Sequence, residues 1–333
     1  MKFTIGFEKE DKAKLYGHFD KIIATERWSE GPFTELFEQK WAEYVGTKYA
    51  VAFSSWFGAA MAALEYFNVR GRAVICPSNT FMATPLSVLK AGGDVEFCDC
   101  NTHDLCAGLR DVMGCMGLST DDWYVGPVGV FLVHIGGHIA FEVDGIAAYC
   151  RQKGMFLIED CAHAHGAIFQ EKKAGTFGDC GVYSFYATKT ISTGEGGMLV
   201  TDNKYLDKFA REYRNYGKPD YRTRGGNHRM SEFTAALGLV QTERVEDIVE
   251  WKNRYVEKHY AGNFETVEFP RTMRSGYYKF IIFDRDGCYG GPTTGAVYDE
   301  PCHLIMNERG SFPATDWVAK NHKCLPIYYR GDE

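Results

Sequence analysis

The sequence predicts an α/β protein with a mostly parallel central sheet that helices cover on both sides. Short apolar segments rich in Val, Ile, Phe and Tyr alternate with helix-length segments through most of the chain. Strands that are apolar on both faces and separated by helices are typical of a parallel sheet. Near residue 246 this alternation gives way to strand-like pieces and Gly-rich loops, which predict a smaller α+β domain at the C-terminus.

Seven segments are predicted to be strands: Tyr49–Phe53, Ala73–Cys76, Val95–Cys98, Gly129–His134, Met155–Glu159, Val182–Tyr186 and Met198–Thr201. Three intervening segments are predicted to be helices: Gly58–Phe67, Thr80–Lys90 and Ala140–Lys153. Ligands of parallel sheets bind beyond the carboxyl ends of the strands, so the strand exits are expected to carry the chemistry.

A longer helix is predicted over Ser231–Tyr260, long enough to leave one domain and enter another. A strand-like piece, Tyr277–Phe283, and a Gly-rich loop over 287–295 follow it. We therefore predict a large domain over 1–245, which includes an N-terminal arm, and a small domain over 246–333.

Composition excludes several classes of protein. The 333 residues carry 37 basic and 44 acidic side chains, a net charge of −7, which argues against binding to nucleic acid or to an anionic membrane. Eleven cysteines form neither a paired zinc pattern nor a small secreted framework. Met1 to Ile5 and the charged residues after them lack the apolar core of a signal peptide, and the stretch 125–135 is too short to span a bilayer. The sequence thus predicts a reduced, cytoplasmic protein.

Two strand exits carry residues suited to one chemistry. Asp160 follows the apolar segment Leu157–Glu159, and about 25 residues later Ser184 precedes Lys189 in a loop of small residues. A desolvated lysine can form a Schiff base, and a neighbouring carboxylate can hold a pyridinium nitrogen protonated, as pyridoxal phosphate (PLP) requires. The alternative is that Asp160 caps a helix and Lys189 is a solvated loop residue. The joint occurrence of the two favours the PLP interpretation.

The sequence motifs around Asp160 and Lys189 resemble those of the DegT-type (DegT/StrS) sugar aminotransferases, which are fold-type I PLP enzymes. The resemblance rests on long motifs at matching spacing: Glu159-Asp160-Cys161-Ala162-His163-Ala164-His165-Gly166, Ser184-Phe185-Tyr186-Ala187-Thr188-Lys189, Gly194-Glu195-Gly196-Gly197 and Pro77-Ser78-Asn79-Thr80-Phe81-Met82-Ala83-Thr84. It covers most of the chain, and it implies PLP as cofactor with pyridoxamine phosphate as an intermediate form.

The resemblance also implies roles for single residues. Lys189 matches the lysine that forms the Schiff base and moves the proton, and Asp160 matches the carboxylate that pairs with the pyridinium nitrogen. Phe81 matches the aromatic that stacks on the ring, and Ser184 matches a hydroxyl that contacts the phosphate. Asn227 matches an asparagine that reaches the phosphate of the neighbouring subunit, which implies a homodimer with shared sites.

The chain departs from the family pattern at three places. The phosphate turn has Ser55-Trp56-Phe57 where Ser-Gly-Thr is usual, although backbone N–H groups at a helix N-terminus can still bind a phosphate. We expect Trp56 and Phe57 to line the pocket. His163 stands where many relatives have Gln, which resembles the relatives that act on cyclitols and also the aminohydroxybenzoate synthases, and it should lie near the cofactor phenolate. Between Phe283 and His303 a short Gly-rich loop replaces a helix of the relatives.

The predicted function is transfer of an amino group from L-glutamate or L-glutamine to a keto sugar, nucleotide-linked in the leading hypothesis. A keto-cyclitol of the scyllo-inosose type is the alternative acceptor, and a non-catalytic PLP-binding regulatory protein is the alternative from another class. Related sugar dehydratases carry His at the lysine position, so Lys189 argues against dehydration. No metal site is expected, because Gly136-Gly137 separates His134 from His138 and disfavours a helical ligand pair.

Overall fold

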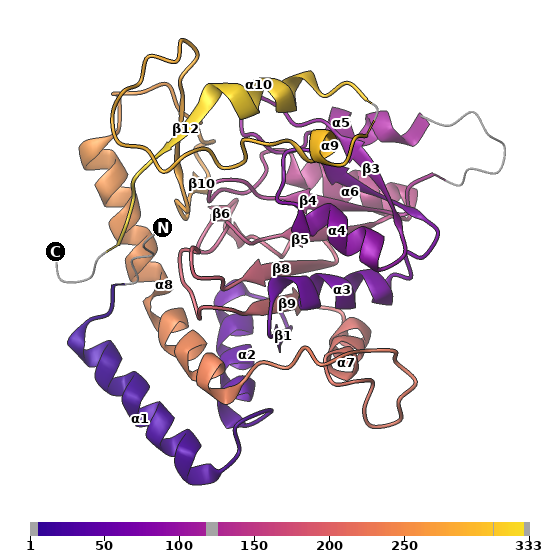
Figure 1. The fold of residues 1–333 in the computed structure, drawn as a ribbon, viewed down its shortest axis with the longest axis vertical. Coiled ribbons are helices and arrows are strands. Elements are labelled where there is room, and N and C mark those ends of the chain that lie inside the picture. Colours follow the sequence, from indigo (N-terminus) through magenta and orange to yellow (C-terminus); the bar gives the residue numbers. More distant parts are fainter. Residues whose placement is uncertain (1–5, 118–125, 309, 330–333) are drawn as a thin grey trace.

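The computed structural model describes residues 6–117, 126–308 and 310–329, so Met1 to Ile5 and the start of the stretch 125–135 lie outside the described residues. A seven-stranded sheet forms the centre of the molecule, with the strand order β1-β9-β8-β5-β4-β2-β3 (Figure 1). Its strands are β1 (Tyr49–Phe53), β2 (Ala73–Pro77), β3 (Asp94–Cys98), β4 (Gly129–Val133), β5 (Phe156–Asp160), β8 (Cys180–Ser184) and β9 (Gly197–Thr201).

All seven predicted strands are found, within about two residues of the expected positions. Strand β9 runs antiparallel to both of its neighbours, and every other pair among β8, β5, β4, β2 and β3 is parallel. Strand β1 therefore points the same way as β8. The carboxyl ends of six strands and the start of β9 meet at one edge, which confirms the predicted α/β class with a mostly parallel sheet.

Side chains alternate between two buried layers along each strand. Val51 and Phe53 of β1 pack in one layer with α3 (Trp56–Tyr66), α4 (Ala83–Lys90) and α7 (Lys204–Tyr213). Ala50 and Ala52 pack in the other layer with α2 (Pro32–Val45), α5 (Leu109–Gly114), α6 (Val143–Lys153) and α8 (Glu232–His259). Both faces of the sheet are thus covered, which explains why the strands are apolar on both sides.

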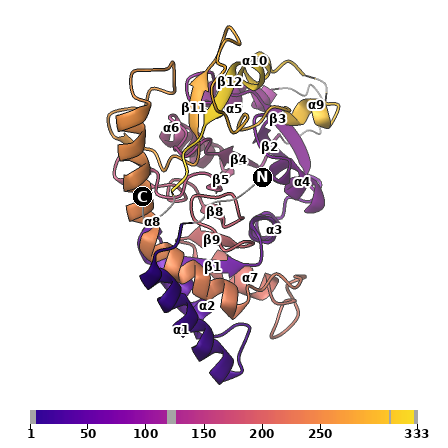
Figure 2. The same ribbon diagram turned by 60° about the vertical axis from the view of Figure 1, so that its left-hand side comes forward.

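The long helix α8 confirms the helix predicted over Ser231–Tyr260. Ser231 caps it, because its hydroxyl oxygen accepts the backbone N–H of Thr234 at 3.1 Å. The N-terminal helix α1 (Lys9–Thr25) packs along α8 (Figure 2). The predicted domain boundary at 245/246 falls inside α8, and the division into two domains stays a prediction.

The C-terminal part is small and largely irregular. It contains a two-stranded antiparallel sheet of β11 (Phe280–Phe283) and β12 (His322–Leu325), with the helices α9 (Cys302–Ile305) and α10 (Pro313–Asn321). Residues 284–300 form neither helix nor strand in the structure. A three-stranded sheet that the sequence did not predict joins β10 (Met273–Arg274) to β6 (Ile168–Phe169) and β7 (Lys172–Lys173). Among the described helices, none has the length and apolarity needed to cross a bilayer.

Candidate active site

A cavity of about 730 Å³ opens at the carboxyl edge of the sheet. Eight of the nine residues predicted for the site line it: Ser55, Trp56, Phe57, Phe81, Asp160, His163, Ser184 and Lys189. They come from α3, from the exits of β5 and β8, and from the loop after β2, so the sheet brings together segments up to about 130 residues apart in sequence.

Asp160 is the last residue of β5 and is only 5% exposed. Its Oδ1 accepts the indole N–H of Trp56 and the backbone N–H of Ala162, each at 3.0 Å. Its Oδ2 accepts the hydroxyl of Thr84 at 3.2 Å. Burial raises the pKa of Asp160, and the Ala162 N–H, the charge of Lys189 and the Thr84 hydroxyl act in the opposite direction. A carboxylate oxygen has two acceptor positions, so Oδ2 can accept one more donor.

Lys189 lies in the loop after β8, where its backbone N–H donates to Tyr186 O at 2.9 Å in a turn. Its ammonium group lies over the ring of Tyr278, 4.8 Å from the centroid. Burial lowers the pKa of Lys189 to about 8, the Asp160 charge raises it, and the Lys279 charge lowers it further. At pH 7 about one Lys189 in ten is therefore the neutral amine, the form that reacts with a carbonyl.

His163 lies on the same wall, 4% exposed, between two tyrosines of the C-terminal part. Its ring stacks on Tyr278, with centroids 4.2 Å apart, and Nε2 lies 3.3 Å from the hydroxyl of Tyr298. Burial, with the charges of Lys189 and Lys279, lowers the pKa of His163 well below its usual value. His163 is therefore neutral at pH 7, and its buried Nδ1 has no hydrogen-bond partner among the described residues.

The start of α3 forms the opposite wall. Ser55 caps this helix, because its hydroxyl oxygen accepts the backbone N–H of Gly58 at 3.2 Å. The N–H groups of Trp56 and Phe57 belong to the first turn, where they have no intrahelical acceptor and can bind an anion. The first residue of β9, Gly197, packs so closely that a Cβ there would lie 2.4 Å from Ser55 C. The first turn of α3 can therefore lie this close to β9 only because residue 197 is a glycine.

A buried hydrogen-bond network supports the exit of β5 from the other face of the sheet. Glu159 accepts backbone N–H groups of Gly175, Phe177 and Gly178, each at 2.7 Å. His134 Nε2 lies 2.9 Å from Glu159, and its Nδ1 accepts the N–H of Ala140 at 3.1 Å. Because Nδ1 is an acceptor, Nε2 carries the proton and donates to Glu159. His134, Glu159 and Cys161 lie close enough together to resemble a set of metal ligands, and the hydrogen bonds of this network explain why His134 and Glu159 lie there.

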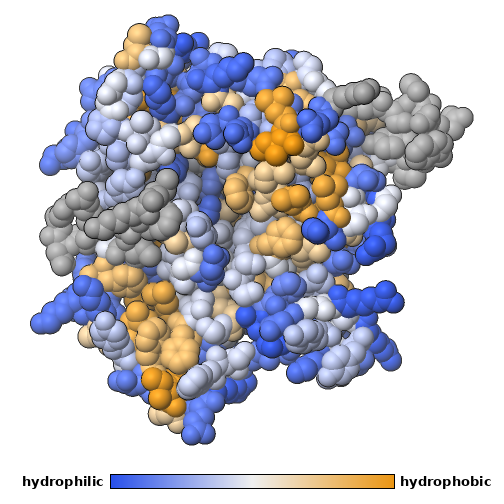
Figure 3. Space-filling model, in the orientation of Figure 1, coloured by the Kyte–Doolittle hydropathy of each residue, from blue (hydrophilic) through white to orange (hydrophobic). Residues whose placement is uncertain are grey.

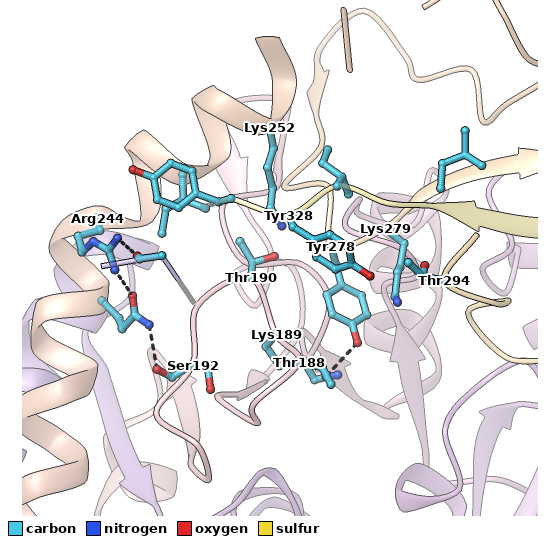
Figure 4. A pocket seen from close by; sticks show the side chains of 16 residues that line it. Thr188, Lys189, Thr190, Ser192, Arg244, Lys252, Tyr278, Lys279, Thr294 and Tyr328 are labelled. Atoms are coloured by element: carbon cyan, nitrogen blue, oxygen red, sulfur yellow. Dashed lines mark hydrogen bonds between the residues drawn. The ribbon is translucent and has the colours of Figure 1, made fainter. Parts of the chain in front are cut away.

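A second cavity of about 70 Å³ lies behind the Lys189 loop (Figure 4). Lys279 lines both cavities, and none of the described carboxylates lies within ion-pair distance of its ammonium group. Lys252 is 5% exposed in this second cavity, and it donates to Tyr277 O at 3.0 Å. Burial and the Lys279 charge lower the pKa of Lys252 to about 7. This side of the site is therefore positively charged.

Asn227 is the one predicted residue that does not line the cavity of its own chain. It is exposed on the segment between α7 and α8, where it pairs with Asn215 in an isolated β-bridge. The sequence did not single out Tyr278, Lys279 and Tyr298, which come from the C-terminal part. Lys279 could have been noticed as the one charged residue in the predicted strand Tyr277–Phe283.

A model of the DegT/DnrJ/EryC1/StrS aminotransferase family matches residues 9–282. The chain belongs to this family. Among solved structures, a DegT DnrJ EryC1 StrS aminotransferase from Brucella abortus has a TM-score of 0.88 and 25% identity, and the match covers 96% of this chain and 91% of that one. This confirms the predicted family and the fold-type I class.

Two curated relatives indicate the range of the DegT family. GDP-perosamine synthase of Vibrio cholerae is 31% identical over 235 residues, which span 69% of this chain and 62% of that relative. A putative L-glutamine:3-amino-2,3-dideoxy-scyllo-inosose aminotransferase of Micromonospora echinospora is 27% identical over 332 residues, 91% of this chain and 74% of the relative. The chain thus spans less than two thirds of the perosamine synthase.

The family and the fold imply PLP as cofactor, and the residues of the cavity fit it. The cavity is larger than the cofactor, Oδ2 of Asp160 retains an acceptor position, and Nδ1 of His163 is buried without a partner. The first turn of α3 offers N–H groups for a phosphate, and Lys189 offers an amine of lowered pKa. The side chains of Trp56 and Phe57 line the cavity and do not fill it.

Proposed function

We propose that this protein is a PLP-dependent aminotransferase that moves an amino group from L-glutamate or L-glutamine to a keto sugar. The observation that carries the proposal is the placement of Lys189 and Asp160, from different strand exits, in one cavity with a lysine of lowered pKa. PLP, when bound, supplies an aldehyde that condenses with amines and a ring that takes up an electron pair.

Each wall of the cavity would hold one part of the cofactor. Oδ2 of Asp160 would accept the N–H of a protonated ring nitrogen, and the ring of Phe81, 64% exposed at the cavity, would cover the ring face. The first N–H groups of α3 and the hydroxyl of Ser184 would hold the phosphate. Lys189 Nζ, neutral in about a tenth of the molecules at pH 7, would take and return the proton at the substrate carbon.

A nucleotide-linked keto sugar is our leading acceptor, because the perosamine synthases among the relatives are named for a GDP-linked sugar. A keto-cyclitol is the second candidate, and two observations favour it. His163, the residue type that the sequence analysis associates with relatives acting on cyclitols, lines the cavity, and Glu195, Asp299 and Glu300 form an exposed acidic rim that would repel a diphosphate. Both acceptors should be offered to the amino-loaded enzyme, and return of the original cofactor absorbance identifies the acceptor that reacts.

We also propose a homodimer with shared sites. Five large apolar side chains are exposed around α4 and α9, beside the cavity, where Figure 3 shows an apolar patch. They are Phe81, Leu86, Leu89, Leu304 and Ile305. Asn227, exposed on its own chain, would reach the partner's cofactor phosphate. Mixing inactive Lys189→Ala and Asn227→Ala chains should restore part of the activity, because one site of the mixed dimer is intact; no restored activity would contradict site sharing.

The enzymatic proposal is tested by adding PLP and then L-glutamate. Wild type should gain a visible absorbance band with PLP and lose it with L-glutamate as the amino group is transferred, whereas Lys189→Ala should be inactive. Lys208→Ala, with a side chain that is 77% exposed, is the matched control and should behave as wild type. A protein that takes up PLP and never changes its absorbance with L-glutamate or L-glutamine would instead be the regulatory protein considered above.

A further inference from the structure

Trp56 makes a contact that its position in the chain does not predict. It is the first residue of α3, it is 8% exposed, and its ring stacks on Phe131 of β4 with centroids 5.6 Å apart. Its indole N–H donates to Oδ1 of Asp160 at 3.0 Å. An indole N–H can only donate, so this contact is made to the carboxylate as an acceptor.

Three donors from different segments determine how the carboxylate of Asp160 is held. Oδ1 accepts two N–H groups, from Trp56 in α3 and from Ala162 after β5. Oδ2 accepts one hydroxyl, from Thr84 in α4. The hydroxyl of Thr84 lies 2.9 Å from that of Thr80, which extends the chain of hydrogen bonds. Because Oδ1 is filled, Oδ2 is the oxygen with a free acceptor position.

We propose that Trp56 is a positioning residue for Asp160, whose indole N–H keeps the carboxylate ionised and leaves Oδ2 as the atom that meets the cofactor ring nitrogen. The second half of this statement rests on the proposed function, and the first half does not. A purely structural Trp56 would act through its stacking on Phe131, which a phenylalanine at position 56 would largely keep. The N–H group therefore distinguishes the two roles.

The charged and titratable groups that face Asp160 come from several elements. Lys189 and His134 lower its pKa, while Cys76, Cys161 and Tyr298 have their own pKa values raised by burial and by the Asp160 charge. The two thiols and the phenol therefore stay neutral up to pH 8. All five groups are unchanged by a substitution at position 56, so their effects cancel when a variant is compared with wild type.

The apoprotein tests the first half of the proposal. Trp56→Phe removes one donor to the charged carboxylate, so the pKa of Asp160 in the folded state rises further above its unfolded value. A raised carboxyl pKa costs no stability at low pH and lowers stability as the pH rises through the folded pKa. We expect the ratio of unfolding constants, variant to wild type, to grow about tenfold to a hundredfold between pH 4 and pH 8.

Two controls separate the N–H group from packing. In an Asp160→Asn background, Trp56→Phe should change stability by the same factor at every pH, because no carboxylate remains to titrate. Trp251→Phe, in α8 and stacked on Tyr255, should also show no pH dependence. A ratio for Trp56→Phe that stays constant between pH 4 and pH 8 would overturn the proposal, because stacking alone would then explain Trp56.

PLP binding tests the second half. In Trp56→Phe the dissociation constant of PLP should rise by up to about tenfold at pH 6, because PLP binding must then ionise Asp160 without the indole donor, and by less at pH 8, where more of the free sites already hold the carboxylate. An unchanged ratio at the two pH values would overturn the second half. If wild type itself fails to bind PLP, the proposed function fails, while the unfolding experiment on the apoprotein still decides the role of Trp56.

Discussion

Replacing Asp160 by Asn should leave the fold intact and slow transamination severely. The hydrogen bonds of the site determine how the amide must lie. Because the position of Oδ1 receives the N–H groups of Trp56 and Ala162, the amide oxygen of Asn must occupy it. The NH₂ group then takes the place of Oδ2, beside the hydroxyl of Thr84. An NH₂ group cannot accept a proton from a ring nitrogen, so the cofactor ring would stay unprotonated.

The size of this effect follows from the lost charge pair. Two unit charges about 3 Å apart in a partly buried site, with an effective dielectric constant of about 20, interact by about 5 kcal/mol. Since about 1.4 kcal/mol corresponds to a tenfold change in rate, the loss is up to about 10⁴-fold. The assay is the single-turnover reaction of PLP-loaded enzyme with L-glutamate. Asp247→Asn, on the exposed side of α8 and away from the cavity, is the matched control and should react at the wild-type rate. A rate for Asp160→Asn within tenfold of wild type would refute the reasoning.

Three further predictions concern neighbouring groups. Lys279→Met should raise the pKa of Lys189, because the positive charge of Lys279 lowers that pKa in wild type. The rate at which PLP is captured at pH 7 should therefore fall, and the pH dependence of this rate should move to higher pH. An unchanged pH dependence would contradict the electrostatic coupling. Glu232→Ala, at the start of α8, should lower the free energy of unfolding by about 2 to 4 kcal/mol in urea denaturation, because three backbone N–H groups at the start of α2 lose a buried carboxylate. Glu250→Ala, on the exposed side of α8, is the control and should lower it by under about 0.5 kcal/mol. Gly197→Ala should weaken PLP binding at least tenfold by displacing the first turn of α3, and equal affinity would show that this contact adjusts freely.

Most of the fold follows from local patterns in the sequence. The seven strands were found because their residues are apolar on both faces, and α8 was found from its 3.6-residue periodicity. The three-stranded sheet of β10, β6 and β7 was missed because its strands are two residues long and the pairing of β10 with β6 joins positions about 100 residues apart. So short a strand has no periodicity to detect.

The candidate site divides in the same way. Asp160 and Lys189 were recognised because each follows an apolar strand inside a long motif, and the sheet then places both in one cavity. Tyr278, Lys279 and Tyr298 were missed because they come from the C-terminal part of the chain. They lie so far in sequence from Asp160 and Lys189 that no local sequence pattern connects them with the cavity.

The sequence by itself determined the fold class, the family and the residues at the strand exits, since these depend on periodicity and on motifs that are continuous along the chain. Only the tertiary structure decided that Trp56 donates to Asp160 and that Lys279 shares a wall with Lys189. The physical reason is that hydrogen bonds and charge interactions depend on distances of a few ångströms between atoms, and folding alone brings together groups that lie 90 to 104 positions apart.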